Sequence, residues 1–430
     1  MKHLIVIAIL LLLFTGTNAQ TRSVKKSPVL TEASPENVGI SQERLARIDK
    51  MCQEEVSNGN LPGMVALVAR KGKIVFWKAY GMADTQNGKH MTRDAIFRIA
   101  SQTKAITCTA VMMLWEEGKF RLDDPVSIYI PEFKNPKVLK SFNPADTSWT
   151  DEPAKSEITI RHLLTHTSGL GYGMIDSDEC LKMIYHKSGV TELFTAKEFY
   201  IGDVVKRLAA LPLHHNPGEK FTYGMSIDVL GYLVEVISGM PLDEFLQTRL
   251  FDPLGMTDTR FYLPESKSDR LVAIQHKVNG KWERFPNSFY ETEYPVKGAK
   301  TFFSGGAGLS GTAKDYAAFL QMYLNGGELN GVRILSRTTV DVIMANHTGE
   351  LWGLPDKYHG LAFAVTTEAG EDKGGIGSEG TFDWGGYFNT QYFADPKEQL
   401  IGLIFKQTQG PVNDVTGWKF RQLVFQTIDD

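Results

Sequence analysis

Apolar positions first recur at helical spacing in the segment that follows a polar N-terminal stretch. Leu45, Ile48, Cys52 and Val56 are three or four residues apart, and a serine at position 41 precedes them. This spacing places apolar side chains along one face of a helix, and serine is a preferred N-cap. The pattern therefore predicts an amphipathic helix that begins after Ser41.

Two short runs of β-favouring residues, at 64–69 and 74–79, follow this helix. The four residues between them, 70–73, include a glycine, and two such runs joined by a Gly-containing turn indicate an antiparallel hairpin. Residues 104–117 are instead apolar on nearly every face and end at Gly118. That pattern predicts a helix that is buried on all sides, near the centre of the molecule.

The rest of the chain changes from a helical to a strand-like pattern. Between about 120 and 300 the apolar spacing is helical, with Pro- and Gly-containing loops between the segments. From about 358 to 406 short β-favouring runs return, and residues 414–428 favour a closing helix. We therefore expect an α/β (α+β) fold, in which an antiparallel sheet built from both ends of the chain is flanked by helices and an all-helical lobe is inserted between the ends.

These patterns set the expected domain boundaries. One domain spans 41–428; its α/β lobe comprises about 41–120 and 300–428, and its helical lobe about 121–299. Residues 20–40 are polar and carry two prolines and two adjacent lysines. Such a composition is typical of irregular segments, so we expect an exposed arm that leads into the fold.

The first nineteen residues have the pattern of a secretory signal peptide. Lys2 and His3 precede an apolar run, 4–14, and small residues follow it up to Ala19. This run is too short to span a bilayer, which takes about 20 apolar residues, and no cysteine near the cleavage site could carry a lipid. We expect cleavage after Ala19, export to the periplasm or the medium, and no stable membrane anchor.

Composition narrows the class of protein further. The chain has 430 residues, with 46 Lys and Arg against 50 Asp and Glu, and a net charge of -4. Nucleic-acid binders usually show a strongly basic face, so no nucleic-acid partner is expected. The hydrophobic content of 42% is enough for a large core. The sequence leaves the oligomeric state open.

Three cysteines, Cys52, Cys108 and Cys180, would lie in an oxidising compartment after export. An odd number leaves at least one thiol free, and the spacing does not decide whether any two of them pair. Cys108 lies within the apolar segment that is predicted to be a buried helix. We therefore interpret Cys108 as a small core residue rather than as a nucleophile.

Candidate chemistry begins at the predicted buried helix, where Ser101 and Lys104 are three residues apart. At that spacing both side chains share one helical face. A serine hydroxyl becomes an effective nucleophile when a neighbouring base takes its proton, and burial favours the neutral amine that can do so. A second Ser-x-x-Lys, from Ser23 to Lys26, lies in the polar arm. Taken alone, Ser101 could equally be an ordinary helix N-cap.

Two further motifs could complete a site. Tyr223 follows a turn at Pro217-Gly218 and precedes a helical segment; a tyrosine beside a lysine can relay a proton. Residues 380–387 form a Gly-rich strand entry that ends in Trp-Gly-Gly-Tyr. Glycine within a strand permits a substrate to lie against bare backbone. Taken singly, these motifs could also be a half-buried loop aromatic and a turn without chemical function.

Together the three motifs resemble the serine β-lactamase and penicillin-binding-protein superfamily. The resemblance is strongest to the class C β-lactamase-related branch, which includes family VIII carboxylesterases and S12-type serine hydrolases. It extends over nearly the whole chain after the signal peptide, through residues 97–104, 160–170, 251–256 and 305–309. The resemblance implies a β-lactamase-like fold, with the active site between an α/β lobe and an inserted helical lobe.

The resemblance also implies a role for each motif. Ser101 would be the acylated nucleophile, Lys104 its base and hydrogen-bond partner, and Tyr223 the proton relay to the leaving group and to the deacylating water. The oxyanion hole would consist of the backbone N–H groups of Ser101 and Tyr387. Loss of one such donor typically removes about 3 kcal/mol of transition-state stabilisation.

Two departures from the family pattern concern the substrate-binding residues, for which the resemblance implies Met225, Trp384, Gly385 and Gly386. Met225 stands where the β-lactamases have an asparagine that holds the acylamino group of the substrate. Trp384 stands where they have a Lys or His that attracts a carboxylate. Loss of a charge-assisted contact costs roughly 1.5 to 3 kcal/mol of recognition, so a penicillin or a peptide is expected to be a poor substrate. Trp-Gly-Gly resembles the carboxylesterase branch instead.

Metal and nucleotide chemistry are not expected from this sequence. His162 and His166 have the spacing of a zinc pair, but no Glu accompanies them in a His-Glu-x-x-His motif and no third ligand can be placed. We therefore assign these two histidines a structural role. The sequence also has no Gly-x-Ser-x-Gly motif and no phosphate-binding loop. We expect neither a metal nor an organic cofactor.

The sequence thus predicts an exported serine hydrolase that forms an acyl-enzyme on Ser101 and acts as a carboxylesterase on small or medium esters. One alternative keeps this chemistry and changes the substrate to an amide, as in a β-lactamase, a D-amino-acid peptidase or a transpeptidase-like enzyme. The other alternative is a catalytically silent binding protein of the same fold. The natural substrate stays open, because specificity in this fold lies in loops.

Overall fold

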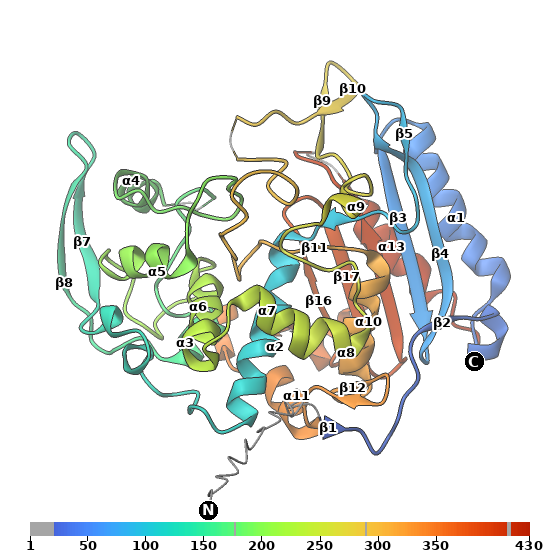
Figure 1. The fold of residues 1–430 in the computed structure, drawn as a ribbon. Helices are drawn as coiled ribbons and strands as arrows, with labels where there is room; N and C mark the ends of the chain where they lie inside the picture. The colour runs from blue at the N-terminus through green and yellow to red at the C-terminus, as the bar shows by residue number, and fades with distance from the viewer. Residues whose placement is uncertain (1–20, 176–177, 289, 411–413) are drawn as a thin grey trace, which may run out of the picture.

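The computed structural model describes residues 21–175, 178–288, 290–410 and 414–430 (Figure 1). The predicted signal peptide, 1–19, lies outside these residues, so its cleavage and export stay predictions. Among the described residues, no helix is both long and apolar enough to cross a membrane.

A nine-stranded sheet forms the centre of the α/β lobe (Figure 1). Its strands lie in the order β14-β15-β16-β17-β18-β3-β4-β2, and β5 pairs with β4. Neighbouring strands are antiparallel, except that β2 runs parallel to β4. The strands of this sheet are β2 (Thr31–Glu32), β3 (Gly63–Arg70), β4 (Lys73–Asp84), β5 (Lys89–His90), β14 (Lys357–His359), β15 (Ala364–Thr366), β16 (Phe382–Gly385), β17 (Thr390–Asp395) and β18 (Leu400–Phe405).

The two ends of the chain meet in this sheet, as the sequence predicts. β18 pairs with β3 along its whole length, from Leu400 opposite Arg70 to Phe405 opposite Val65. β3 and β4 form the predicted hairpin, with Arg70 opposite Lys73 at the turn. The long-range pairing of β18 with β3 therefore joins the C-terminal strands to the N-terminal hairpin.

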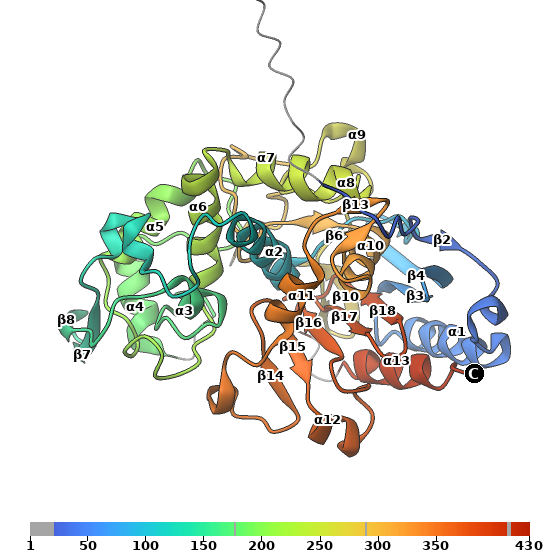
Figure 2. The same ribbon diagram turned by 90° about the horizontal axis from the view of Figure 1, so that it is seen from below.

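Both faces of the sheet are covered by hydrophobic side chains. β3 is buried along its whole length, and its side chains alternate between two clusters because successive residues of a strand point to opposite faces. Val65 and Leu67 belong to the larger cluster, which also contains α2 and α10. Met64 and Ala66 belong to the smaller cluster, where α1 and α13 cover the other face (Figure 2).

The helices begin and end close to where the sequence places them. α2 passes through the centre of the molecule, and every residue from Thr103 to Leu114 is buried. α1 begins after Ser41, whose side chain accepts a hydrogen bond from Arg44 N, as the N-cap pattern predicts. The α-helices are α1 (Gln42–Ser57), α2 (Thr103–Glu116), α3 (Ile160–Leu164), α4 (Glu179–Lys187), α5 (Ile201–Ala209), α6 (Ser226–Ser238), α7 (Leu242–Leu246), α8 (Asp252–Leu254), α9 (Glu265–Ser268), α10 (Ala313–Leu324), α11 (Arg337–Met344), α12 (Glu368–Lys373) and α13 (Thr416–Phe425).

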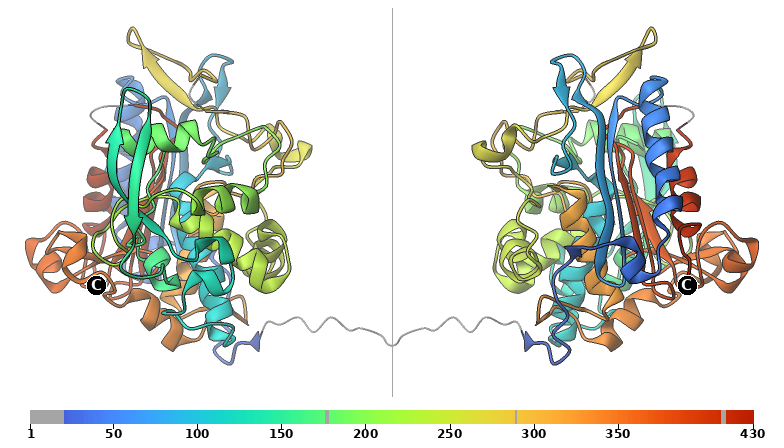
Figure 3. Two further views of the ribbon diagram at one scale, coloured as in Figure 1. Left: turned by 90° about the vertical axis from the view of Figure 1, so that its left-hand side faces the viewer. Right: turned by 90° about the vertical axis from the view of Figure 1, so that its right-hand side faces the viewer.

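The inserted segment is mainly helical but also contains strands. β7 (Lys137–Asn143) and β8 (Ser148–Pro153) form an antiparallel hairpin at the outer edge of the molecule (Figure 1), on the side that faces the viewer in the left view of Figure 3. β9 (Gln275–Val278) and β10 (Lys281–Arg284) form a second hairpin. The expectation of an all-helical lobe is corrected to this extent. In β7 only Val138 is buried, so no alternating apolar pattern marks this solvated hairpin in the sequence.

Most residues of the described part of the arm are exposed, and the arm is joined to the domain at two places. β1 (Thr21–Arg22) pairs with β13 (Val332–Arg333), which also pairs with β12 (Glu328–Leu329). β2 joins the edge of the main sheet, and Leu30 and Val38 are buried. A few apolar side chains and backbone pairing at a sheet edge therefore hold a segment whose overall composition is polar.

The three cysteines are unpaired in the structure, which answers the question that the sequence leaves open. Cys52 and Cys108 are buried, and burial raises the pKa of each thiol to about 12. A thiol with so high a pKa stays protonated and unreactive at neutral pH. The interpretation of Cys108 as a core residue is confirmed.

Candidate active site

Ser101 stands in a tight turn between a short strand and the central helix. β6 (Phe97–Arg98), which pairs with β11 (Ser310–Gly311), leads into the 3-10 helix η2 (Ala100–Gln102), and α2 begins directly after it. Ala100 has a φ of 44°, in the left-handed region that costs a residue with a Cβ about 1–2 kcal/mol. The chain accepts this strain at the residue that precedes Ser101, and the serine side chain stays partly exposed.

Lys104 lies one turn after Ser101, at the start of α2, and is buried. Its Nζ is 3.3 Å from Ser101 Oγ, and it donates hydrogen bonds to the Gly306 carbonyl oxygen at 2.8 Å and to the Tyr172 hydroxyl at 2.9 Å. A neutral amine has two N–H donors and one lone pair. With both donors used by Gly306 and Tyr172, the lone pair of such an amine would face Ser101 Oγ.

The loop that contains Ser304, Gly305 and Gly306 supplies the carbonyl that accepts from Lys104. Side chains from two helices hold this loop. The Asp228 carboxylate on α6 accepts hydrogen bonds from Ser304 Oγ at 2.6 Å and from Gly306 N at 3.1 Å. Thr107 Oγ1 on α2 donates to the Gly305 carbonyl at 2.8 Å. Burial raises the pKa of Asp228 against the effect of these hydrogen bonds. The loop thus offers the buried amine an acceptor whose position the surrounding helices determine.

Tyr223 lies beside the lysine, at the N-terminal end of α6. The Lys104 Nζ atom is 4.5 Å from the centre of the Tyr223 ring. Trp384 Nε1 donates to the Tyr223 hydroxyl at 3.3 Å, and the His166 ring is 4.7 Å from the tyrosine ring. The preceding residue, Thr222, is tied by its N–H to the His166 carbonyl at 2.7 Å. The structure therefore brings Ser101, Lys104, Tyr223 and Trp384 together.

A second hydroxyl binds Lys104 besides that of Ser101: it belongs to Tyr172, which sequence reasoning missed. Tyr172 is buried, its ring centre is 5.8 Å from that of Tyr223, and burial raises its pKa well above the ordinary value. It therefore stays protonated at neutral pH. The available signal was its place two residues after the family-like segment 160–170, between two glycines.

The turn between β16 and β17 lies against the segment that leads into Ser101. Gly386 N donates to the Thr390 carbonyl at 2.7 Å, and Asn389 N donates to the Gly386 carbonyl at 2.9 Å. Tyr387 occupies the second position of this turn, where the N–H takes no part in the turn hydrogen bond. A Cβ at Gly386 would lie 2.5 Å from the Ile99 carbonyl oxygen, so only glycine lets the hairpin pack against the segment that enters Ser101. The Ser101 and Tyr387 amides stay the predicted oxyanion hole.

We predict that Gly386→Ala lowers kcat for ester hydrolysis at least about tenfold, because the added methyl group would displace the turn that carries the Tyr387 N–H. Gly385→Ala is the comparison for kcat only, since a Cβ there meets its nearest atom, the Thr390 carbonyl oxygen, at 3.4 Å; KM can change, because Gly385 is itself a predicted substrate-binding residue. Steady-state kinetics with a p-nitrophenyl ester would measure both variants. Equal kcat values for the two would contradict the importance of this packing.

Met225 is not at the surface of the site. Its side chain is 0% exposed and belongs to the main hydrophobic cluster, and its N–H donates to the Gly171 carbonyl at 3.2 Å. The expectation that Met225 contacts a substrate is therefore corrected, because the residue faces the core. It still offers no amide at the position where the β-lactamases have one. Trp384 and Gly385 end strand β16 and Gly386 follows it; their contact with substrate stays a prediction.

The two histidines at zinc-like spacing have separate structural surroundings. His162 Nδ1 accepts a hydrogen bond from Thr159 N at 3.2 Å and completes a capping box at the start of α3. His166 is buried, and this burial lowers its pKa well below the ordinary value, so its ring is neutral. In the part of the chain that the structure describes, no group of three His, Cys, Asp or Glu side chains could hold a metal.

Known proteins share both the sequence and the fold. Residues 48–426 match the Beta-lactamase family. Esterase EstB of Burkholderia gladioli is 30% identical over 84% of this chain and 90% of its own. A D-alanyl-D-alanine carboxypeptidase-like protein of Escherichia coli strain K12 is 29% identical over 91% of this chain and 89% of its own. The solved structure of EstCE1, a hydrolase with promiscuous acyltransferase activity, matches with a TM-score of 0.77 and 28% identity, over 89% of this chain and 99% of that one. The chain belongs to the beta-lactamase family, a family of serine hydrolases with a β-lactamase-like fold.

Proposed function

We propose that the protein is an exported carboxylesterase that forms an acyl-enzyme on Ser101. The observation that carries this proposal is the position of Lys104 Nζ, 3.3 Å from Ser101 Oγ and hydrogen-bonded to Gly306 and Tyr172. This is the nucleophile-and-base arrangement that serine acylation needs. Export rests on the N-terminal sequence alone.

The proposed reaction has two steps. Ser101 Oγ attacks the ester carbonyl carbon while its proton passes to Lys104 Nζ, and the developing oxyanion is bound by the N–H groups of Ser101 and Tyr387. The bond to the alcohol breaks as the proton reaches the leaving oxygen through Tyr223. Water then attacks the acyl group, which releases a carboxylic acid and restores the serine hydroxyl.

The aromatic contacts of Trp384 favour an ester over a β-lactam or a peptide C-terminus. The Trp384 ring lies 5.5 Å from His359, 5.8 Å from Tyr223 and 5.9 Å from Trp352. Burial lowers the pKa of His359 to about 4, so this ring carries no charge at neutral pH. These ring contacts offer no cation for a substrate carboxylate. Lys357 and Arg421, which share a pocket with Trp384, are both paired with Asp383. The similarity to EstB and EstCE1 supports the same choice.

Two other functions remain as outcomes of one experiment. The similarity to a D-alanyl-D-alanine carboxypeptidase-like protein supports an amide substrate as the first alternative. The second alternative is a binding protein that keeps the fold and has no turnover. Hydrolysis of p-nitrophenyl acetate, a chromogenic cephalosporin and a D-alanyl-D-alanine peptide should be compared at neutral pH. We expect kcat/KM for the ester to exceed the other two at least about tenfold, the factor that corresponds to a missing charge-assisted contact. Faster turnover of either amide would reject the esterase, and absence of turnover together with absence of fluorophosphonate labelling would indicate the silent binder.

A further inference from the structure

Arg98, on strand β6, is a buried arginine whose positive charge is not paired with a carboxylate. The residue is 2% exposed. Its Nη1 donates to the Val272 carbonyl at 2.7 Å, and its Nε has no hydrogen-bond partner in the described part of the chain. Burial lowers the pKa of Arg98 to about 10, so the group still carries its charge at neutral pH. Arginine is almost never fully buried unless it is paired, so this charge calls for a partner that the described residues do not supply.

Arg98 lines a cavity of about 350 Å³. Pockets that bind small organic molecules have volumes of about 300–1,000 Å³. The wall is formed mainly by residues 268–274, 284–287 and 292–296. It shares no lining residue with the pocket that holds Ser101 and Lys104. The cavity is therefore a second site, and an inference about it goes beyond the proposed esterase function and does not depend on it.

Two carboxylates of the wall are already bound to other cations. Arg284 Nε donates to Asp84 Oδ2 at 2.8 Å, and Asp84 is buried. Glu293, whose charge also acts on Arg98, pairs with Lys297 at 2.6 Å. Neither carboxylate is therefore free to compensate the charge of Arg98.

The other two charged residues of the wall, Lys89 and Asp269, are exposed. Water and salt screen exposed charges much more than buried ones. Arg98 thus remains as a buried and uncompensated charge, and an anion that enters the cavity would lie in a field that favours it.

The cavity also has an apolar part, which indicates an organic anion. Its aliphatic and aromatic lining residues are Leu271, Val272, Ala273, Ile274, Phe285 and Val296. A guanidinium binds a carboxylate through two parallel N–H···O bonds. Because the Val272 carbonyl holds Nη1, the edge formed by Nε and Nη2 is the one that remains for such a pair of bonds.

We propose that this cavity binds a small organic monocarboxylate, whose carboxylate pairs with Arg98 and whose hydrocarbon part lies against the apolar lining residues. One negative charge is enough, because Arg98 is the buried charge that lacks compensation. A ligand that binds the folded chain stabilises it, so the carboxylate should also raise the thermal unfolding temperature.

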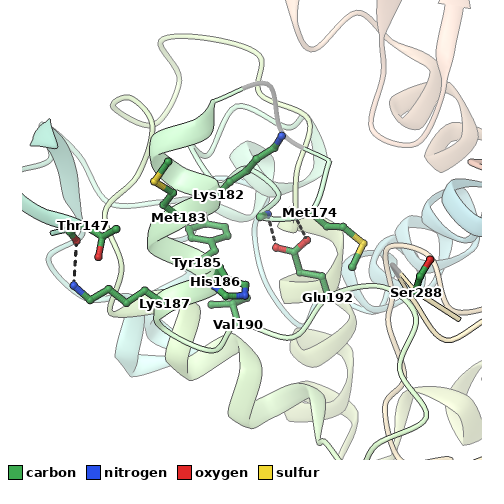
Figure 4. Close-up of a pocket in the computed structure, with 11 residues that line it drawn as sticks. Thr147, Met174, Lys182, Met183, Tyr185, His186, Lys187, Val190, Glu192 and Ser288 are labelled. Atoms are coloured by element: carbon green, nitrogen blue, oxygen red, sulfur yellow. Dashed lines mark hydrogen bonds between the residues drawn. The ribbon is translucent and has the colours of Figure 1, made fainter. Parts of the chain in front are cut away.

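A larger cavity, of about 620 Å³, lies beside α4 in the helical lobe and provides the comparison (Figure 4). Its cations already have acceptors: Lys182 Nζ pairs with Glu179 at 2.8 Å, and Lys187 Nζ donates to the Asp146 carbonyl at 3.0 Å. We therefore expect no carboxylate to bind there, although this cavity is larger.

Isothermal titration calorimetry at neutral pH, in a buffer without carboxylate or phosphate, tests the ligand class. The probes are butyrate, its neutral isostere butyramide, and inorganic phosphate. We expect one butyrate to bind per chain with a Kd on the order of 1 mM or lower. This Kd should be at least about tenfold below that of butyramide, which lacks the charge-assisted bonds. Absence of saturable butyrate binding, equal affinity for butyramide, or binding of phosphate alone would overturn the inference.

Variants locate the binding site. Arg98→Met should raise the Kd for butyrate at least about tenfold, and butyrate should no longer raise its unfolding temperature. Lys89→Met, at an exposed position of the wall, should raise the Kd about two- to fivefold, and it decides the question if Arg98→Met does not fold. Lys182→Met is the matched control, because it removes one positive charge from the larger cavity, and it should leave the Kd unchanged.

Three results with these variants would overturn the inference. The first is an unchanged Kd in a folded Arg98→Met protein, and the second is an unchanged Kd in Lys89→Met. The third is an equal rise of the Kd in Lys182→Met, which would show that butyrate responds only to the net charge of the chain.

Discussion

Replacement of Ser101 by alanine is expected to reduce kcat for p-nitrophenyl acetate on the order of 10⁴- to 10⁶-fold, the loss that follows removal of a serine nucleophile. The variant should also lose labelling by a fluorophosphonate, because the other hydroxyl that contacts the Lys104 amine, that of Tyr172, belongs to a buried residue. Intact-mass measurement after labelling reports the covalent step directly. The thermal unfolding temperature should change little, since Ser101 is partly exposed.

The control for this experiment is the second Ser-x-x-Lys of the chain. Ser23 lies beside β1, and its Oγ accepts a hydrogen bond from Lys25 N at 3.2 Å, a local contact within the arm. Ser23→Ala should retain full activity and full labelling. Normal labelling of the Ser101 variant, or loss of activity in the Ser23 variant, would show that Ser101 is not the nucleophile.

Replacement of Lys104 by methionine should lower the rate of acylation about 10²- to 10⁴-fold, the usual contribution of a general base. Methionine keeps the length and the apolar stem of the side chain and removes the amine that reaches Ser101, Gly306 and Tyr172. Rapid-mixing measurement of the p-nitrophenol burst isolates the acylation step. Thermal unfolding, measured in parallel, separates lost chemistry from lost structure, because the substitution also leaves a buried carbonyl without its donor.

Tyr172→Phe provides the comparison for this variant. It removes one hydrogen-bond partner of the lysine and keeps the ring in the core, so we expect a smaller loss, about tenfold, in the same acylation step. Loss of Lys104 removes the proposed proton acceptor itself. Loss of the Tyr172 hydroxyl removes only one of the contacts that position the lysine, so the amine can still act. If Lys104→Met acylated as fast as Tyr172→Phe, the lysine would not be the base.

Local patterns in the sequence were sufficient for most of the secondary structure and for the class of chemistry. The spacing around Leu45 and the serine before it determined α1, and the turn glycine between two apolar runs determined the β3–β4 hairpin. The all-round apolar character of 104–117 determined that α2 is buried. These features depend on residues within one or two turns of one another, so short-range physics decides them. The motif residues Ser101 and Lys104 belong to this class because they are three positions apart, in η2 and at the start of α2.

Contacts between distant segments were decided only by the tertiary structure. Tyr172 meets Lys104 across 68 positions of the chain, and the Gly306 carbonyl meets it across 202. No local pattern encodes either contact. Likewise, Met225 turned out to be a core residue, since the direction of a side chain at a helix start depends on what packs against it.

The solvated β7–β8 hairpin and the pairing of the N-terminal arm with the domain were also decided only by the tertiary structure. Exposed strands need no apolar alternation, and a polar segment can be held by pairing at a sheet edge, so composition predicted neither. The sequence by itself determined the helices, the central hairpin and the family resemblance, because these depend on periodicity and on short motifs. The tertiary structure alone decided that the Tyr172 hydroxyl binds the lysine and that the loop with Gly306 supplies its acceptor, because these contacts depend on long-range packing.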